Sequence, residues 1–215
     1  MTDELIHLSD MLSHTHLTTS ERDSITWKLT NDGTYSARSA YNFQFEGLVS
    51  SDMYTAVWRS WAPTKCKIFL WMALQCKILT ADVLLSRGWD NNYFCPLCIR
   101  SLETTSHLLY ECPWSRKVWD GLAVAANLTS LNPQSWLAET TLREWFPSLT
   151  DYVMEERRKK GAKALAILIC WELWLERNRR IFQQKELPVP ILISRIRDEA
   201  ATWKLAGCPI VFDPG

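Results

Sequence analysis

The chain has 215 residues, of which 47% are hydrophobic and 12 are tryptophans. This length is typical of one large domain or two small ones, and the apolar fraction excludes a disordered protein. The 24 basic and 24 acidic residues cancel, which argues against strong non-specific nucleic-acid binding by the whole chain. The many tryptophans indicate packed helical faces.

The sequence contains no segment typical of secretion or membrane insertion. The first 16 residues are acidic and have no apolar run of signal length. The longest apolar stretch, ALAILICWELWLE, is interrupted by Glu172 and Glu176. Seven cysteines without a secretion signal are typical of reduced thiols or metal ligands. We therefore expect a cytoplasmic or nuclear protein that is not secreted.

The N-terminal part predicts a tail or short helix over residues 1–22, then a small β-hairpin. Apolar and polar residues alternate over residues 25–29, which is the period of a strand, and residues 31–33 have the composition of a turn. Residues 37–48 then carry apolar side chains at helical spacing. The hairpin is therefore predicted to precede the first helix of a domain.

The rest of the chain is predicted to be helical. We expect two helices within residues 56–88, one from Pro113 to Ala126, a short one through Trp145 that Pro147 ends, a long one from Asp151 to Gln184 and a last one over residues 192–203. The fold class predicted is mainly α.

Four candidate zinc ligands lie in CPLCIRSLETTSHLLYEC, residues 95–112. Cys95, Cys98, His107 and Cys112 have the spacing C-x2-C-x8-H-x4-C, and zinc prefers this mixture of sulfur and imidazole. A CxxC pair alone also occurs as a redox pair, and the alternative here is buried free thiols with a surface histidine. The downstream histidine and cysteine favour zinc. Four protein ligands would close its shell, which predicts a structural ion.

Pro113 explains how His107 and Cys112 can meet. On an ideal helix a residue five positions later points away, but the residue before a proline is pushed out of helical geometry. We therefore expect a short helix to end at Cys112 and to let its sulfur turn back toward the histidine. Glu103 and the hydroxyls of residues 104–106 are expected to cap this helix or to support the ligands.

Several segments occur in the order known from one family. After Trp27 come GTYSARSAY from Gly33, VWRSWAPTKCKIFLWMAL from Val57, TADVLLSRGW from Thr80 and CPLC…ETTSHLLYECPWSRKVW from Cys95. This stretch resembles the zinc-binding domain of plant LINE-type (non-LTR) retroelement reverse transcriptases. The later CWELWLERNRRIF, from Cys170, is similar to the segment that follows this domain in those polyproteins.

The resemblance implies a zinc-binding domain over residues 23–126 and a C-terminal helical region over residues 127–215. Family members often have glycine or a small polar residue where this chain has Ile99. The sequence contains no polymerase or RNase H region and no aspartate pair suited to two magnesium ions. We therefore expect a free-standing, retroelement-derived piece that is not an enzyme and that holds Zn²⁺ as a structural ion.

The other cysteines and histidines are expected to have no metal role. The cysteines interpreted as core thiols are Cys66, Cys76, Cys170 and Cys208. The histidines assigned to a solvated tail are His7, His14 and His16.

Two basic segments are candidates for nucleic-acid contact. They contain Arg157, Arg158, Lys159 and Lys160, and then Arg177, Arg179 and Arg180. Aromatic residues next to the second segment could stack on bases. The same aromatic residues also belong to a helical apolar stripe, and glutamates flank both segments at salt-bridge spacing. A solvated helix face is therefore favoured over a nucleic-acid surface.

Two functions remain open after the sequence. Family origin favours a nucleic-acid-binding accessory domain of a reverse transcriptase. The neutral charge and the tryptophan-rich helices favour a protein-interaction module that binds a host protein or itself in a regulatory or antagonistic role. We expect protein interaction for this chain, with RNA or DNA as the alternative partner and with no membrane or small-molecule substrate.

Overall fold

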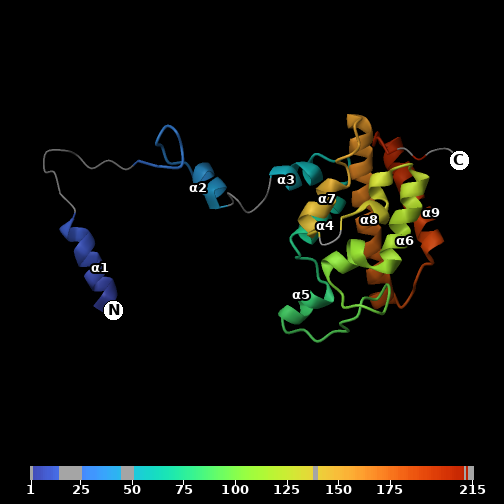
Figure 1. Ribbon diagram of the computed structural model, residues 1–215, viewed down its shortest axis with the longest axis horizontal. Coiled ribbons are helices and arrows are strands. Elements are labelled where there is room, and N and C mark those ends of the chain that lie inside the picture. Colours follow the sequence, from blue (N-terminus) through green and yellow to red (C-terminus); the bar gives the residue numbers. More distant parts are fainter. Residues whose placement is uncertain (1, 15–25, 45–50, 138–139, 211, 213–215) are drawn as a thin grey trace. The chain divides into compact units, whose positions relative to one another are not determined.

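The computed structural model describes residues 2–14, 26–44, 51–137, 140–210 and 212. These residues form helices joined by loops, which confirms the mainly α fold class (Figure 1). The chain divides into two units, Met1–Leu48 and Val49–Gly215. The domain boundaries expected at residues 22 and 126 stay predictions.

The first unit contains two helices, α1 (Thr2–Ser13) and α2 (Ala37–Gln44). The β-hairpin predicted before α2 is wrong, because residues 26–36 form a tight loop and no strand occurs in the described part of this unit. One backbone hydrogen bond crosses the loop, from Trp27 N to Gly33 O at 2.8 Å. Ile25, where the predicted strand begins, lies outside the described residues.

Local polar contacts explain why this segment forms a loop. The Asp32 carboxylate accepts hydrogen bonds from the backbone N–H and the hydroxyl of Thr34, at 3.1 and 2.7 Å. The Thr30 hydroxyl donates to the Thr34 carbonyl at 3.0 Å. These bonds close a turn and compete with a strand ladder. A two-stranded ribbon without a third strand is marginal in water, so the local bonds prevail.

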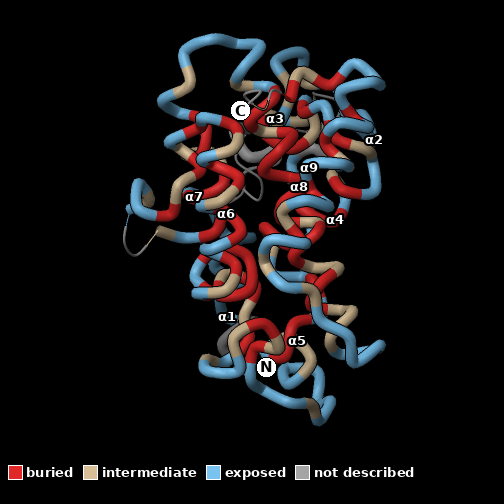
Figure 2. Tube along the Cα trace, turned by 90° about the vertical axis from the view of Figure 1, so that its right-hand side faces the viewer, coloured by how far each residue is buried: buried red, intermediate tan, exposed pale blue. Residues whose placement is uncertain are grey.

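The described residues of the second unit form seven α-helices, with the long helix α8 at the centre. They are α3 (Ser51–Trp58), α4 (Thr64–Leu74), α5 (Ala81–Ser86), α6 (Pro113–Ala125), α7 (Leu142–Ser148), α8 (Glu156–Gln183) and α9 (Val189–Leu205). Helix α8 packs against α4, α9 and the His107–Glu111 turn. Its middle is apolar on nearly every side, so neighbours cover it all round (Figure 2).

Two predicted helix ends differ from the structure. Helix α8 begins at Glu156 and not at Asp151, because buried Thr150 and half-buried Val153 hold a turn before it, with Val153 N donating to Thr150 O at 3.2 Å. Helix α7 continues through Pro147, because a proline in the last turn of a short helix removes only one backbone bond.

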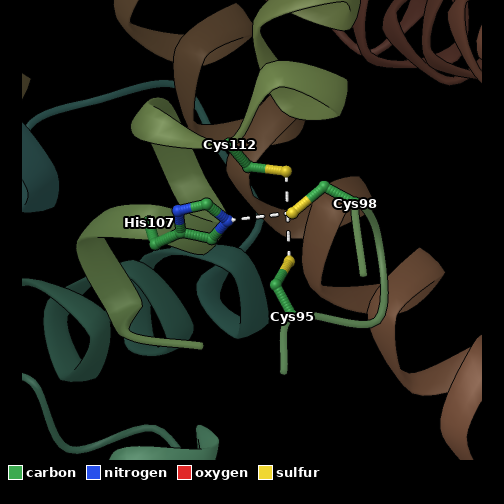
Figure 3. A group of neighbouring side chains, drawn as sticks. All are labelled: Cys95, Cys98, His107 and Cys112. Carbon is green, nitrogen blue, oxygen red and sulfur yellow. Dashed lines mark hydrogen bonds between the residues drawn. The ribbon is translucent and has the colours of Figure 1, made fainter. Parts of the chain in front are cut away.

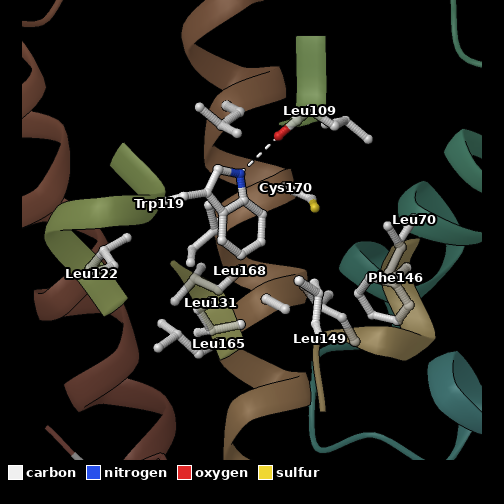
Figure 4. Close-up of a cluster of buried hydrophobic side chains, with 14 of the residues drawn as sticks. Leu70, Leu109, Trp119, Leu122, Leu131, Phe146, Leu149, Leu165, Leu168 and Cys170 are labelled. Carbon is white, nitrogen blue, oxygen red and sulfur yellow. Dashed lines mark hydrogen bonds between the residues drawn. The ribbon is translucent and has the colours of Figure 1, made fainter. Parts of the chain in front are cut away.

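The core of the second unit joins α8 to the segment that carries the candidate ligands. Trp119 of α6 is fully buried, and its indole N–H donates to the Leu109 carbonyl at 2.8 Å (Figure 4). Tyr110 stacks on Trp145 with ring centroids 4.7 Å apart. The helices therefore pack through tryptophan side chains, as predicted. Leu109 and Tyr110 attach the ligand segment to this tryptophan-rich core.

The C-terminal segment crosses α8 at a glycine. A Cβ at Gly161 would lie 2.2 Å from the Pro209 carbonyl oxygen, so any larger residue would push the two backbones apart.

Among the helices that the structure describes, none combines the length and the apolar character needed to span a membrane.

Candidate metal centre

The four predicted ligands converge in the second unit (Figure 3). Their sulfur and nitrogen atoms all lie within 4.8 Å of one another. Cys95 Sγ is 3.9 Å from Cys112 Sγ, and Cys98 Sγ is 3.3 Å from His107 Nε2. Tetrahedral zinc with Zn–S of about 2.3 Å and Zn–N of about 2.0 Å separates its ligand atoms by about 3.5–3.8 Å. The cluster therefore has the dimensions of a zinc site.

The first two ligands lie on a tight turn that we call the knuckle, residues 95–99. Ile99 N donates to Cys95 O at 2.8 Å and closes the turn. A minimal antiparallel bridge, Phe94 with Leu102, forms the base of the knuckle. Backbone N–H groups of the turn also point at the Cys95 sulfur, as they do where a thiolate is bound to metal.

Ile99 adopts a left-handed backbone conformation, with φ of +56°. This region is rare for β-branched residues and costs roughly 1–3 kcal/mol. The side chain is 76% exposed, so little packing offsets the strain. The resemblance drew attention to this position because family members often have glycine here, and the turn still forms with isoleucine.

Ile99→Gly is therefore expected to raise the free energy of unfolding of the zinc-loaded protein by about 1 kcal/mol, since the relief of strain exceeds the entropy cost of glycine. Urea denaturation measures the change. Ile99→Val is the matched control, because it keeps the branched side chain and the strain. A glycine variant less stable than the valine variant would contradict the assignment of strain to this residue.

The other two ligands are brought together by a π-helical turn, His107–Glu111. Cys112 N donates to His107 O at 2.7 Å, a bond between residues five positions apart. In an α-helix these residues would point about 140° apart, whereas a π turn aligns them. The helix ends at Cys112 as predicted, but the π turn, and not the break before Pro113, aligns the ligands. Thr104 Oγ1 accepts from His107 N at 3.0 Å, which confirms the predicted hydroxyl cap.

Cys112 is also the N-cap of α6, and Pro113 is the first helical residue. The pKa of Cys112 is lowered to about 3 by a hydrogen bond from the Cys95 thiol, a bond from His107 and the backbone N–H groups of Ser115 and Trp114. The N-terminus of a helix favours negative charge, so the fold itself stabilises this thiolate.

The pKa values of the other buried ligands, Cys95 and His107, are shifted as well. The pKa of Cys95 is raised, first because its thiol donates to Cys112 and then because it is buried. The pKa of His107 is raised to about 9, chiefly by its bond to Cys112. The raised pKa values mean that the protonated forms of Cys95 and His107 are favoured beside the Cys112 thiolate. Zinc would supply positive charge and displace these protons, so zinc affinity is expected to fall in acid.

The burial of the ligands completes the fit. Cys95 and Cys112 are fully buried, His107 is 7% exposed and Cys98 is partly exposed. All four positions of a tetrahedral ion come from the protein, so no position remains for water or substrate. The class of site is a closed, structural Cys₃His zinc centre.

Comparison with known proteins gives a family match for part of the chain. Residues 35–119 match the family described as zinc-binding in reverse transcriptase, and all four ligands lie within this match. This segment is therefore similar to the zinc-binding domain of reverse transcriptases. The chain is also 28% identical over 107 residues to the Arabidopsis thaliana protein named "Putative ribonuclease H protein At1g65750". Both matches fit a retroelement-derived origin.

The relative is much longer than the shared region. The match covers 48% of this chain and 17% of the Arabidopsis protein. No solved structure matches the chain.

Glu103 has a different role from the one predicted. Its carboxylate accepts two hydrogen bonds from Arg177, at 2.8 and 2.9 Å, and both side chains are almost fully buried. It also accepts from Ala81 N at 2.9 Å and so caps α5 in place of the His107 turn. Sequence reasoning missed the pair because its members are 74 residues apart.

The second basic segment lies mostly inside the fold. Arg177 is buried, and Arg179 and Arg180 both pair with the buried carboxylate of Glu176. The first segment lies at the start of α8 and is mostly exposed. In it, Arg158 donates to Asn127 O at 2.6 Å. Lys160 lies 3.7 Å from Glu156, and the other residues of this segment are Arg157 and Lys159. A nucleic-acid role for either segment stays a prediction.

The other cysteines lie outside the metal cluster. Cys66, Cys170 and Cys208 are buried, as predicted for core thiols. Cys76 is exposed, contrary to the prediction, because the chain turns away from the core after α4 with Cys76 at φ of +53°. His7 is exposed on α1, His14 is exposed just after it, and His16 lies outside the described residues.

Proposed function

We propose that the chain is a non-catalytic, zinc-organised module that binds a protein partner. The observation that carries the proposal is an exposed apolar surface beside the metal centre, which we call the knuckle surface: Phe94, Ile99, Leu102 and Ile181. The closed ligand set supports the non-catalytic part, because no ligand position is open for chemistry. A regulatory or antagonistic role in the host follows as part of this proposal.

The zinc fold itself creates the knuckle surface. Phe94 and Leu102 form a bridge pair, flanked by the bonds Cys95 N to Ser101 O and Glu103 N to Tyr93 O, so the two side chains lie side by side on one face. Cys95 and Glu103 point to the opposite, buried face. The outward pair is 50% and 63% exposed, which is typical of a contact surface when neighbouring residues are apolar too.

Helix α8 completes this surface on the other side. Phe94, Ile99 and Ile181 line a cavity of about 600 Å³ between the knuckle and the end of α8. Polar and charged residues, among them Asn92 and Lys185, also line this cavity, so it suits a partner side chain whose apolar part inserts among polar neighbours. The partner is therefore a protein with an exposed apolar residue, and a second copy of the chain is the case that is simplest to test.

The test compares Phe94→Ser/Leu102→Ser with Leu137→Ser, which changes an even more exposed leucine elsewhere. Sedimentation at micromolar concentration measures self-association, and cross-linking in plant extract identifies a host partner. We expect association by the unmodified protein and by the Leu137 variant, and its loss in the double variant with zinc content unchanged. A strictly monomeric protein that cross-links to nothing, or equal behaviour of the variants, would reject the proposal.

Nucleic-acid binding is the second candidate, and the start of α8 favours it. Arg157 and Lys160 are exposed near the positive end of the helix dipole, where a phosphate would be stabilised, and Lys160 also lies 3.7 Å from Glu156. Tyr152, 86% exposed, lies just before them and could stack on a base. Titration of labelled single-stranded RNA should then show salt-dependent binding that Arg157→Glu/Lys160→Glu abolishes. A flat titration at low salt would exclude this candidate.

A further inference from the structure

We propose that Arg180 of α8 is a positioning residue for the zinc site, and that α8 is therefore part of the zinc-binding domain. The family match ends at residue 119, so nothing in it assigns a metal-related role to α8. The inference is independent of the protein-binding proposal, because it concerns only how the ligands are held.

Arg180 contacts the backbone between the first two ligands. Its Nη1 donates to the carbonyl of Pro96 at 3.1 Å and to the carbonyl of Leu97 at 3.2 Å. These are the two residues between Cys95 and Cys98. Fixing both carbonyls orients the peptide planes of the knuckle, and with them the N–H groups that face the Cys95 sulfur.

The same guanidinium also contacts the half of the site that carries Cys112. It lies over the ring of Trp114, 4.7 Å from the ring centroid. Trp114 is the second residue of α6 and follows Cys112 by two positions. Arg180 thus contacts both halves of the site, the one with Cys95 and Cys98 and the one with Cys112. Along the chain these halves are connected only by the residues between Cys98 and His107.

The position of Arg180 is fixed from the opposite side. Glu176 is fully buried, and its carboxylate accepts from Arg180 Nε at 2.9 Å, from Leu187 N at 2.9 Å and from Arg179. The Arg180 side chain is only 11% exposed. A guanidinium held by a buried carboxylate, an aromatic face and two carbonyls has little freedom, which is what positioning requires.

Charge gives a second reason for a cation here. Zinc with three thiolates and a neutral imidazole carries a net charge of about −1. Arg179 and Arg180 share the single buried charge of Glu176, which leaves one positive charge beside the knuckle. Glu186 also approaches Arg180 at 3.5 Å, but its side chain is 76% exposed and therefore well screened. The surplus positive charge is complementary to the zinc–thiolate centre.

Arg177, one turn earlier on α8, extends the same arrangement. It binds Glu103, on the segment that leaves the knuckle, while Arg180 binds the knuckle turn. Helix α8 therefore contacts the ligand segment on both sides of the Cys98 position. This gives the CWELWLERNRRIF segment a defined structural role within the zinc domain.

The test is the rate at which zinc passes from the protein to a chromogenic chelator. Arg180→Met keeps the apolar stem and removes the guanidinium, and we expect zinc to dissociate about 10–100-fold faster. Arg180→Lys keeps the charge and is expected to give an intermediate rate. Arg158→Met is the matched control, because Arg158 is also on α8 and also donates to a backbone carbonyl, that of Asn127. Its rate should equal that of the unmodified protein.

A second measurement separates positioning from general support of the fold. Thermal stability is compared with and without zinc for the unmodified protein and each variant. We expect Arg180→Met to lower the melting temperature more in the zinc-loaded protein than in the metal-free protein. An unchanged zinc dissociation rate, or an equal loss of stability in both forms, would overturn the proposal. If the methionine variant does not fold, the lysine variant decides by the same criteria.

Discussion

Cys112→Ser is expected to abolish stoichiometric zinc binding and to lower the free energy of unfolding by more than about 4 kcal/mol, because loss of a metal is among the few single changes with so large an effect. Cys112 combines three roles in the structure. It is a ligand, its backbone N–H donates the π-turn hydrogen bond to the His107 carbonyl, and it is the N-cap residue of α6. Serine keeps the size of the side chain but is a poor zinc ligand.

Metal analysis of the purified protein and chemical denaturation check this result. Cys76→Ser is the matched control, since Cys76 is an exposed thiol outside the cluster. The control should retain one zinc per chain and its stability. A Cys112 variant that keeps both its zinc and its stability would show that the cluster does not hold the fold together.

Glu103→Ala is the second change with a large expected effect, a loss of about 3–5 kcal/mol in the free energy of unfolding. The substitution leaves the Arg177 guanidinium buried without a carboxylate and removes the cap from Ala81 N. Burying an unpaired charge is costly, whereas the pair itself adds little net stability. The double variant Glu103→Leu/Arg177→Met should therefore recover a large part of the loss.

Denaturant unfolding of the three proteins measures these differences. Glu186→Ala is the matched control. Glu186 also pairs with an arginine of α8, Arg180, but its side chain is 76% exposed. Its expected loss is less than about 1 kcal/mol. Equal losses for Glu103→Ala and Glu186→Ala would contradict the expected cost of leaving the Arg177 guanidinium buried without a carboxylate.

The zinc ligands could be predicted because their chemistry is local in the sequence. Cys95 and Cys98 are close enough to share one turn, and His107 and Cys112 follow within the same short segment. The π turn that aligns the second pair was not predicted, because no residue pattern distinguishes it from the end of an α-helix. The pattern identified the ligands but not the backbone that positions them.

The role of α8 could not be predicted for a different reason. Its apolar run was recognised as a long helix, but such a run has the same pattern whether it packs within the chain or against a partner. Arg177 and Arg180 appeared as a charged face, because their partners Glu103 and Pro96 lie 74 and 84 residues away. The hairpin failed because alternation over a few residues is a weak signal when no third strand is present.

X-ray absorption at the zinc edge of the purified, zinc-loaded protein tests the central claim most directly, namely that four protein side chains close the metal site. We predict one zinc per chain, with three sulfur ligands at about 2.3 Å and one nitrogen at about 2.0 Å. An oxygen ligand from water, or fewer than three sulfurs, would contradict the closed site formed by Cys95, Cys98, His107 and Cys112.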